Sequence, residues 1–131
     1  MGTPAASLTG KTLLLIDPSE EYLAGLRTFF EQKGNVVLTV STGTTALELF
    51  RVKEIDAVIL DYQFVDMTAE RIATEFKKLK PRLPIVLYAT DLPSVPPNAL
   101  GLVDTFLGKN QPPEQLVPLL ERAFRRAARL G

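Results

Sequence analysis

The sequence predicts an α/β protein in which one parallel sheet is covered by helices on both faces. Short apolar runs alternate five times with longer amphipathic stretches along the 131 residues. The runs are continuous and rich in Val, Ile and Leu, which is typical of strands buried on both sides. A repeated strand–helix order favours parallel strands joined by right-handed crossovers. We therefore expect a single three-layer domain with no internal linker.

Five apolar runs mark the expected strands in order. They span residues 13–16, 36–40, 57–60, 85–88 and 105–107. A first helix follows the first run, where Ser19 is suited to cap it and Glu20 and Glu21 favour its dipole. Gly34 is expected to end this helix.

Later helices are expected to begin at three positions, namely Thr44, Thr68 and Pro113. The helix that begins at Thr68 should turn Ile72, Phe76 and Leu79 inward. Three prolines fall within residues 91–98, so this segment is expected to be a loop, and any helix before the fifth strand to be short. The last helix should reach about Leu130.

Cysteine and histidine are both absent from the chain, and their absence excludes whole classes of chemistry. With no cysteine there are no disulfides, thiolate metal sites or thiol nucleophiles. With no histidine there are no Ser-His triads and no imidazole acid–base steps. The chain must therefore work through carboxylates, lysine, arginine, hydroxyls, backbone groups or a bound metal.

The overall charge and the N-terminal residues bear on the protein's binding partners and its localisation. The 15 basic and 15 acidic residues balance, so nothing in the net charge favours nucleic acid or an anionic membrane. Residues 1–10 have neither the basic nor the apolar part of a secretory signal, and we expect them to be a flexible lead-in before a domain over 11–131. No apolar run approaches the ~20 residues that span a bilayer. The expectation is a cytoplasmic protein.

Charged residues follow three of the expected strands directly. Asp17 ends the first, Asp61 the third, and Lys109 follows the fifth. Ligand sites of open parallel sheets lie beyond the carboxyl ends of the strands, so these side chains should meet. Two carboxylates beside one another suit a hard cation such as Mg²⁺, and a lysine suits a phosphoryl oxygen. An aspartate at a strand end is often only a helix cap, but the three together favour phosphoryl transfer.

Four sequence blocks resemble those of the response-regulator receiver domain of two-component signalling. They are LLLID at 13–17, AVILD at 57–61, PIVLY at 84–88 and FLGK at 106–109. The resemblance covers about residues 11–124, including GTTAL at 43–47. It implies a flavodoxin-like doubly wound (βα)5 fold with five strands in the order 2-1-3-4-5.

The resemblance also implies the roles of the strand-end residues. Asp61 falls on the phosphoacceptor, and Lys109 on the lysine that contacts the phosphoryl group. Asp17 falls on the first of two acidic positions that bind Mg²⁺, together with the acceptor and a backbone carbonyl, here that of Gln63. Such a domain is not an enzyme beyond catalysing its own phosphorylation and dephosphorylation.

This sequence departs from the family at several of these positions. Pro18 replaces the second acidic residue, which should weaken Mg²⁺ binding. The switch hydroxyl position holds Ala89, with Thr90 one place on and expected to face the other way. The aromatic partner of the switch is Phe106, without a hydroxyl. Phe64 and its neighbours replace the usual Met-Pro-Gly turn, so we expect an atypical receiver.

Two functions stay open at this point. In the first, Asp61 accepts a phosphoryl group from a sensor histidine kinase or phosphotransfer protein with help from Mg²⁺. In the second, a pseudo-receiver binds its partner without phosphorylation. The first is favoured because Asp17, Asp61 and Lys109 are all present. A flavodoxin-type nucleotide site is a weaker third reading, because residues 18–21 are acidic and lack glycine.

The partners expected beyond the phosphodonor are a downstream protein or a fused output domain. A homodimer could form through strands and helices four and five, as in other family members. A stripe of arginines marks the last helix, at positions 122, 125, 126 and 129. Basic residues near a helix C-terminus complement its dipole, so a nucleic-acid partner is not favoured.

Overall fold

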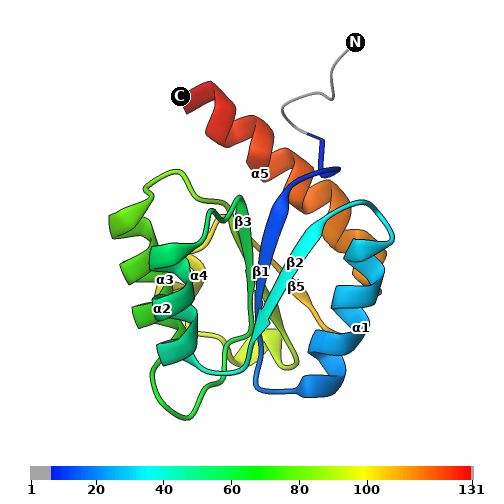
Figure 1. Cartoon of the computed structure of the whole chain (residues 1–131). Coiled ribbons are helices and arrows are strands. Elements are labelled where there is room, and N and C mark those ends of the chain that lie inside the picture. The colour runs from blue at the N-terminus through cyan, green and yellow to red at the C-terminus, as the bar shows by residue number, and fades with distance from the viewer. Residues whose placement is uncertain (1–6, 131) are drawn as a thin grey trace.

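The computed structural model describes residues 7–130, which form a five-stranded parallel sheet with helices on both faces (Figure 1). The strands lie in the order β2-β1-β3-β4-β5, as the resemblance implied. Their bounds are β1 Thr12–Ile16, β2 Val36–Val40, β3 Ala57–Leu60, β4 Ile85–Ala89 and β5 Thr105–Gly108. All four strand pairs are parallel, so the carboxyl ends of the strands meet at one edge of the sheet.

Within the described residues, five helices and two 3₁₀ turns alternate with the strands. The helices are α1 Glu20–Glu31, α2 Gly43–Val52, α3 Ala69–Leu79, α4 Pro97–Leu100 and α5 Leu116–Leu130, with 3₁₀ turns η1 Leu92–Ser94 and η2 Pro113–Gln115. The side chains of Ser19, Thr42 and Thr68 cap α1, α2 and α3. Gly34 has a φ of 87° and follows α1, the left-handed conformation that glycine tolerates best.

Strand residues alternate between two separate cores. In β1, Leu14 and Ile16 face α2, α3 and α4, whereas Leu13 and Leu15 face α1 and α5. Every residue of β3 and β4 is buried, which explains why the sequence shows continuous apolar runs there. The sheet is thus held between two helical layers, and its carboxyl edge is fixed from both sides.

Two details differ from the sequence predictions. Leu79 was expected to face inward but is 57% exposed, because it is the last residue of α3 and lies beyond the buried part of that helix, which ends at Phe76. The segment 91–98 was expected to be a loop, but it contains the 3₁₀ turn η1 and the start of α4, which is only four residues long. The short fourth helix was expected from the prolines.

Part of the expected lead-in packs on the domain. Leu8 is 3% exposed and belongs to the core under α1 and α5, and its carbonyl accepts a 2.5 Å hydrogen bond from the Asn35 amide. The packed core therefore includes a residue ahead of position 11. The predicted flexibility of residues 1–6 concerns a segment outside the described residues. None of the described helices is long and apolar enough to cross a membrane.

Candidate functional site

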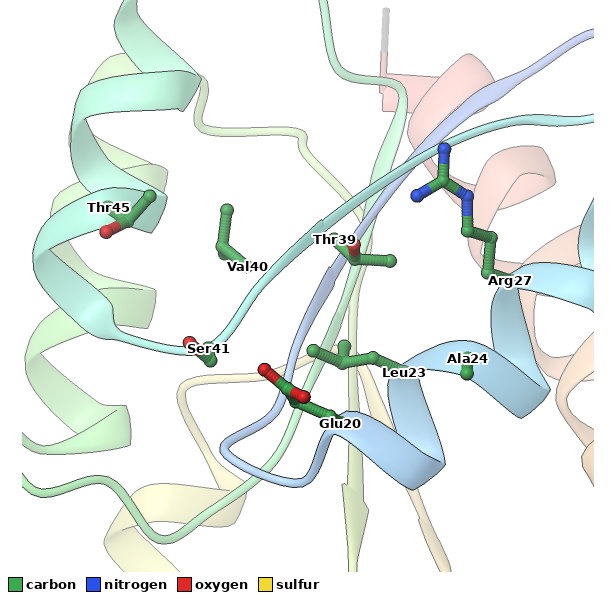
Figure 2. Close-up of a pocket in the computed structure, with 8 residues that line it drawn as sticks. All are labelled: Glu20, Leu23, Ala24, Arg27, Thr39, Val40, Ser41 and Thr45. Atoms are coloured by element: carbon green, nitrogen blue, oxygen red, sulfur yellow. The ribbon is translucent and has the colours of Figure 1, made fainter.

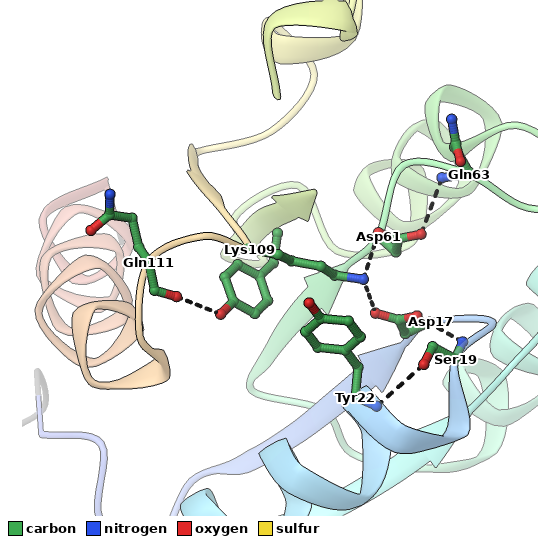
Figure 3. Close-up of polar contacts among 8 residues, drawn as sticks. Asp17, Ser19, Tyr22, Asp61, Gln63, Lys109 and Gln111 are labelled. Atoms are coloured by element: carbon green, nitrogen blue, oxygen red, sulfur yellow. Dashed lines mark hydrogen bonds and ion pairs between the residues drawn. The ribbon is translucent and has the colours of Figure 1, made fainter. Parts of the chain in front are cut away.

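The three charged residues predicted from the strand ends meet at the carboxyl edge of the sheet (Figure 3). Asp17 follows β1 and Asp61 follows β3, so neighbouring strands bring the two carboxylates together. Lys109 follows β5, two strands from β3, and its backbone N–H donates to the Ala89 carbonyl at the end of β4. The long lysine side chain therefore passes over the end of β4 to reach the carboxylates.

Lys109 bridges both carboxylates. Its Nζ lies 2.6 Å from Oδ2 of Asp17 and 3.0 Å from Oδ1 of Asp61. The three side chains are only 4–9% exposed, so the charges interact with little screening by solvent. Two carboxylates against one ammonium leave the cluster with one net negative charge.

Backbone groups orient the remaining carboxylate oxygens. Ser19 donates its N–H to Oδ1 of Asp17 at 2.8 Å, and Gln63 donates its N–H to Oδ2 of Asp61 at 3.3 Å. Each aspartate thus accepts a hydrogen bond from the residue two places later, a turn that aspartate commonly forms. Both carboxylates are held in place without the second acidic residue that Pro18 replaces.

Burial and charge shift the pKa values of this cluster. Burial raises the pKa of Asp17 above its ordinary 3.8, and the nearby charge of Asp61 raises it further, although hydrogen bonds from Lys109 and Ser19 oppose the change. Burial alone would lower the pKa of Lys109. Its hydrogen bonds to Asp17 and Asp61 and their negative charges outweigh that effect, so the Lys109 pKa lies above 10.5 and the side chain stays cationic.

A tyrosine of the first helix, which was not among the predicted site residues, also contributes to the site. The ring of Tyr22, in the first turn of α1, lies 4.0 Å from Nζ of Lys109. Tyr22 packs edge-on against Tyr88 of β4, whose hydroxyl donates to the Gln111 carbonyl at 2.9 Å. The position of Tyr22 three residues after the Ser19 cap was the available signal, because it places the ring at the carboxyl edge of the sheet.

A pocket of about 210 Å³ opens beside Asp61. Thr90 and Ser94, from the segment after β4, line it with hydroxyl-bearing side chains. Thr90 follows the last residue of β4 and lies in a turn, so strand alternation no longer fixes the direction of its side chain. Ala89 also borders the pocket but is 2% exposed, whereas Phe106 is 43% exposed and lines a different pocket.

The loop after Asp61 is tied to the start of α2. Oδ1 of Asp66 accepts from the Gly43 N–H at 3.1 Å, and Oδ2 accepts from the N–H and hydroxyl of Thr44, both at 2.8 Å. These hydrogen bonds, led by the backbone N–H of Thr44, lower the pKa of Asp66 to about 2. This contact was not predicted from the sequence, and it ties down the loop that replaces the family's usual Met-Pro-Gly turn.

In the described part of the chain, no third carboxylate joins Asp17 and Asp61. Glu20 lines a separate surface pocket of about 430 Å³ between α1 and β2, together with Arg27 and Thr45 (Figure 2). Glu21 lines a groove along α1 on the other side. Across residues 7–130, no three acidic side chains gather closely enough to hold a metal ion. Neither glutamate therefore replaces the acidic residue missing at position 18.

Comparisons with known proteins agree with this geometry. The sequence profile of the response regulator receiver domain matches residues 13–121. The aerobic respiration control sensor protein ArcB of Escherichia coli is 39% identical over 75 residues, which are 57% of this chain and 10% of ArcB. The autoinducer 1 sensor kinase/phosphatase LuxN of Vibrio campbellii is 29% identical over 75 residues, 57% of this chain and 9% of LuxN. The chain thus spans about a tenth of the length of these relatives.

Solved structures match nearly the whole chain. A response regulator receiver domain protein from Clostridium thermocellum has a TM-score of 0.81 at 26% identity and covers 92% of this chain and 99% of its own. TrrA of Thermotoga maritima, solved in complex with Mg²⁺-BeF, has a TM-score of 0.80 at 21% identity, covering 86% and 98%. With the sheet order and a family profile that matches more than half of its residues, this chain belongs to the response regulator receiver domain family.

Proposed function

We propose that Asp61 accepts a phosphoryl group and that Lys109 stabilises it. The observation that carries the proposal is the 3.0 Å contact between Nζ of Lys109 and Oδ1 of Asp61 at the wall of a pocket. An Asp61 oxygen attacks the phosphorus of a donor such as a phosphohistidine. The new P–O bond forms as the P–N bond breaks, and the leaving nitrogen keeps the electron pair. The fixed ammonium balances charge on the transferred group without having to reorganise.

The residues present also fit a Mg²⁺ ion. Proteins usually bind Mg²⁺ through one or two carboxylates, with water and substrate phosphate completing the shell. Asp17, Asp61 and the backbone carbonyl of Gln63 are the oxygen donors that would hold the ion. When bound, Mg²⁺ would supply charge neutralisation for the incoming phosphoryl group. We expect weak binding, because Pro18 adds no third carboxylate and Lys109 already contacts both aspartates.

The proposed phosphodonor is a sensor histidine kinase or a phosphotransfer protein. The relatives ArcB and LuxN are sensor proteins, one of them named as a kinase/phosphatase, and each contains a segment similar to this chain. The response would pass to a downstream protein or a fused output domain in the cytoplasm. In a homodimer formed through strands and helices four and five, β5 and α5 would supply most of the surface, because α4 has only four residues.

Intact-mass measurement tests the proposal. The chain is incubated with acetyl phosphate, with and without Mg²⁺, beside an Asp61→Asn variant. We expect one phosphoryl group per chain, dependent on Mg²⁺ and absent from the variant. If no adduct forms with the small donor or with a sensor kinase, phosphorylation of Asp61 is refuted, and binding without phosphorylation becomes the better description of this receiver.

A further inference from the structure

The ring of Tyr22 forms one wall of the enclosure around the Lys109 ammonium. The two carboxylates hold Nζ from the strand side, and the ring centroid lies 4.0 Å away on the α1 side (Figure 3). The lysine side chain is only 4% exposed, whereas Tyr22 itself is 39% exposed. The ring therefore lies between the ammonium and solvent.

The ring is itself held in place. The Ser19 hydroxyl accepts from the Tyr22 N–H in the α1 cap, which fixes the backbone at this turn. The ring packs edge-on to Tyr88 with centroids 6.5 Å apart, and Tyr88 is 3% exposed. The Tyr22 hydroxyl makes no hydrogen bond to any described residue. The aromatic face, rather than the hydroxyl, is thus the part of Tyr22 that contacts the site.

We propose that Tyr22 is a positioning residue for Lys109. Its ring holds the ammonium between Asp17 and Asp61 and excludes water from that side. A cation over an aromatic face is attracted by the ring quadrupole, most strongly where both groups are shielded from water. A lysine stem is flexible, so without the ring the ammonium gains other positions, including solvated ones. The part of this inference that concerns rate rests on the proposed phosphorylation of Asp61, but the shielding of Lys109 does not.

The chain offers a matched control on the same helix. Nζ of Lys33 lies 4.8 Å from the ring centroid of Phe29, a second cation–ring pair in the same N-terminal part of the fold. Phe29→Ala removes a ring of similar size from α1 without touching the strand-end cluster. Tyr22→Phe keeps the ring and removes only the hydroxyl, and Tyr22→Ala removes both. Alanine favours helix, so a half-exposed position in α1 tolerates it.

Two measurements on the full chain test the proposal. The first is the labelling rate of Lys109 by an amine-reactive acylating reagent, followed by peptide mass spectrometry under native conditions. We expect Tyr22→Ala to label about 2- to 30-fold faster than wild type, the range that corresponds to a cation–ring contact. Tyr22→Phe and Phe29→Ala should label at the wild-type rate. The second is the initial rate of phosphorylation by acetyl phosphate, which should fall by a similar factor in Tyr22→Ala only.

The outcomes separate this inference from the proposed function. Unchanged Lys109 labelling in Tyr22→Ala would overturn the positioning role, and so would faster labelling in Tyr22→Phe, since that would implicate the hydroxyl. Equal effects in Tyr22→Ala and Phe29→Ala would reduce the finding to general loosening of α1. A wild-type chain that takes no phosphoryl group refutes the proposed function, while the labelling comparison still decides the role of Tyr22.

Discussion

Asp17 is the nearer of the two carboxylates bound by Lys109, at 2.6 Å from Nζ, although the residues are 92 positions apart in the chain. Asp61 lies slightly further away, at 3.0 Å. The lysine thus compensates two buried negative charges at once, and neither aspartate has another cationic side chain among its described ion pairs. The charge balance of the site depends on this single ammonium.

Replacing Lys109 by methionine should destabilise the fold and do so most at neutral and higher pH. The variant leaves two buried carboxylates facing each other, and breaking a buried pair in this way costs about 3–5 kcal/mol. On acidification Asp17, whose pKa is already raised, takes up a proton and the repulsion disappears. Urea unfolding at several pH values should therefore show a deficit that shrinks as the pH falls.

Lys77→Met is the matched control for that measurement. Lys77 pairs with Asp104 at 2.9 Å, but both side chains are more than a quarter exposed. Solvent screens this pair, so its loss should cost less than the loss of Lys109. The proposed charge balance would be contradicted if Lys109→Met lowered the free energy of unfolding no more than Lys77→Met does. It would also be contradicted if the effect of Lys109→Met did not vary with pH.

Asp17→Asn should lower phosphorylation without lowering stability at neutral pH. Because the folded pKa of Asp17 lies above 3.8, the folded chain binds this proton more tightly than the unfolded chain. The wild-type free energy of unfolding therefore decreases as the pH rises from 3.8 through the folded pKa of Asp17, because the buried carboxyl loses its proton. Asparagine carries no titrating proton and so avoids this decrease. Asp17→Asn also removes an oxygen ligand, which should weaken the apparent Mg²⁺ affinity by at least about 10-fold. Even the loss of a residue that only orients a metal ligand commonly weakens metal binding by that factor.

Urea unfolding and a Mg²⁺ titration of phosphorylation check both parts of this prediction. Asp56→Asn is a useful comparison, because Asp56 also accepts a backbone hydrogen bond, at 2.7 Å from the Thr12 N–H, but lies at the opposite end of the sheet. An Asp17→Asn protein clearly less stable than wild type at pH 7 would show that the contact with Lys109 outweighs burial.

The sequence predicted the strands and the meeting of Asp17, Asp61 and Lys109 for one physical reason. Continuous apolar runs are required of strands buried on both faces, and parallel strands must bring their carboxyl ends together. The sheet order came from the family resemblance rather than from the runs. Contacts that depend on loop paths and side-chain direction were beyond this reasoning, as with Tyr22 over Lys109 and Asp66 at the start of α2.

Gly43→Ala should destabilise the fold, and most of that cost should disappear when Met67→Ala is combined with it. A Cβ added at Gly43 would overlap Cγ of Met67, lie 2.6 Å from its Sδ and 3.0 Å from Cδ1 of Ile72. Such overpacking costs about 1–3 kcal/mol. With Met67 truncated, the overlap with its side chain is removed and only the 3.0 Å approach to Ile72 remains, so the cost of Gly43→Ala should fall toward zero.

A double-mutant cycle measured by urea unfolding tests this coupling. Gly25→Ala is the control, because a Cβ at Gly25 meets nothing within 4 Å and should therefore be neutral or stabilising. Additive effects of Gly43→Ala and Met67→Ala would mean that the two residues do not pack together. The cycle also reports on the loop after Asp61, since Met67 belongs to it.

Asp66→Asn should loosen the attachment of the same loop, with an effect that depends on pH. The Asp66 pKa is lowered to about 2, chiefly by the N–H and hydroxyl of Thr44 and by the N–H of Gly43. A carboxyl with a lowered folded pKa stabilises the protein above its unfolded value of 3.8, and that stability is lost as the pH falls toward 2. Asparagine keeps one acceptor oxygen but lacks the charge that favours a helix N-terminus.

The urea midpoints of wild type and Asp66→Asn should therefore differ at pH 6 and converge as the pH falls from about 4. Thr44→Val, which removes only the hydroxyl contact, should show a smaller difference at pH 6. A gap that stays constant down to pH 3 would mean that the carboxylate charge of Asp66 does not hold the loop.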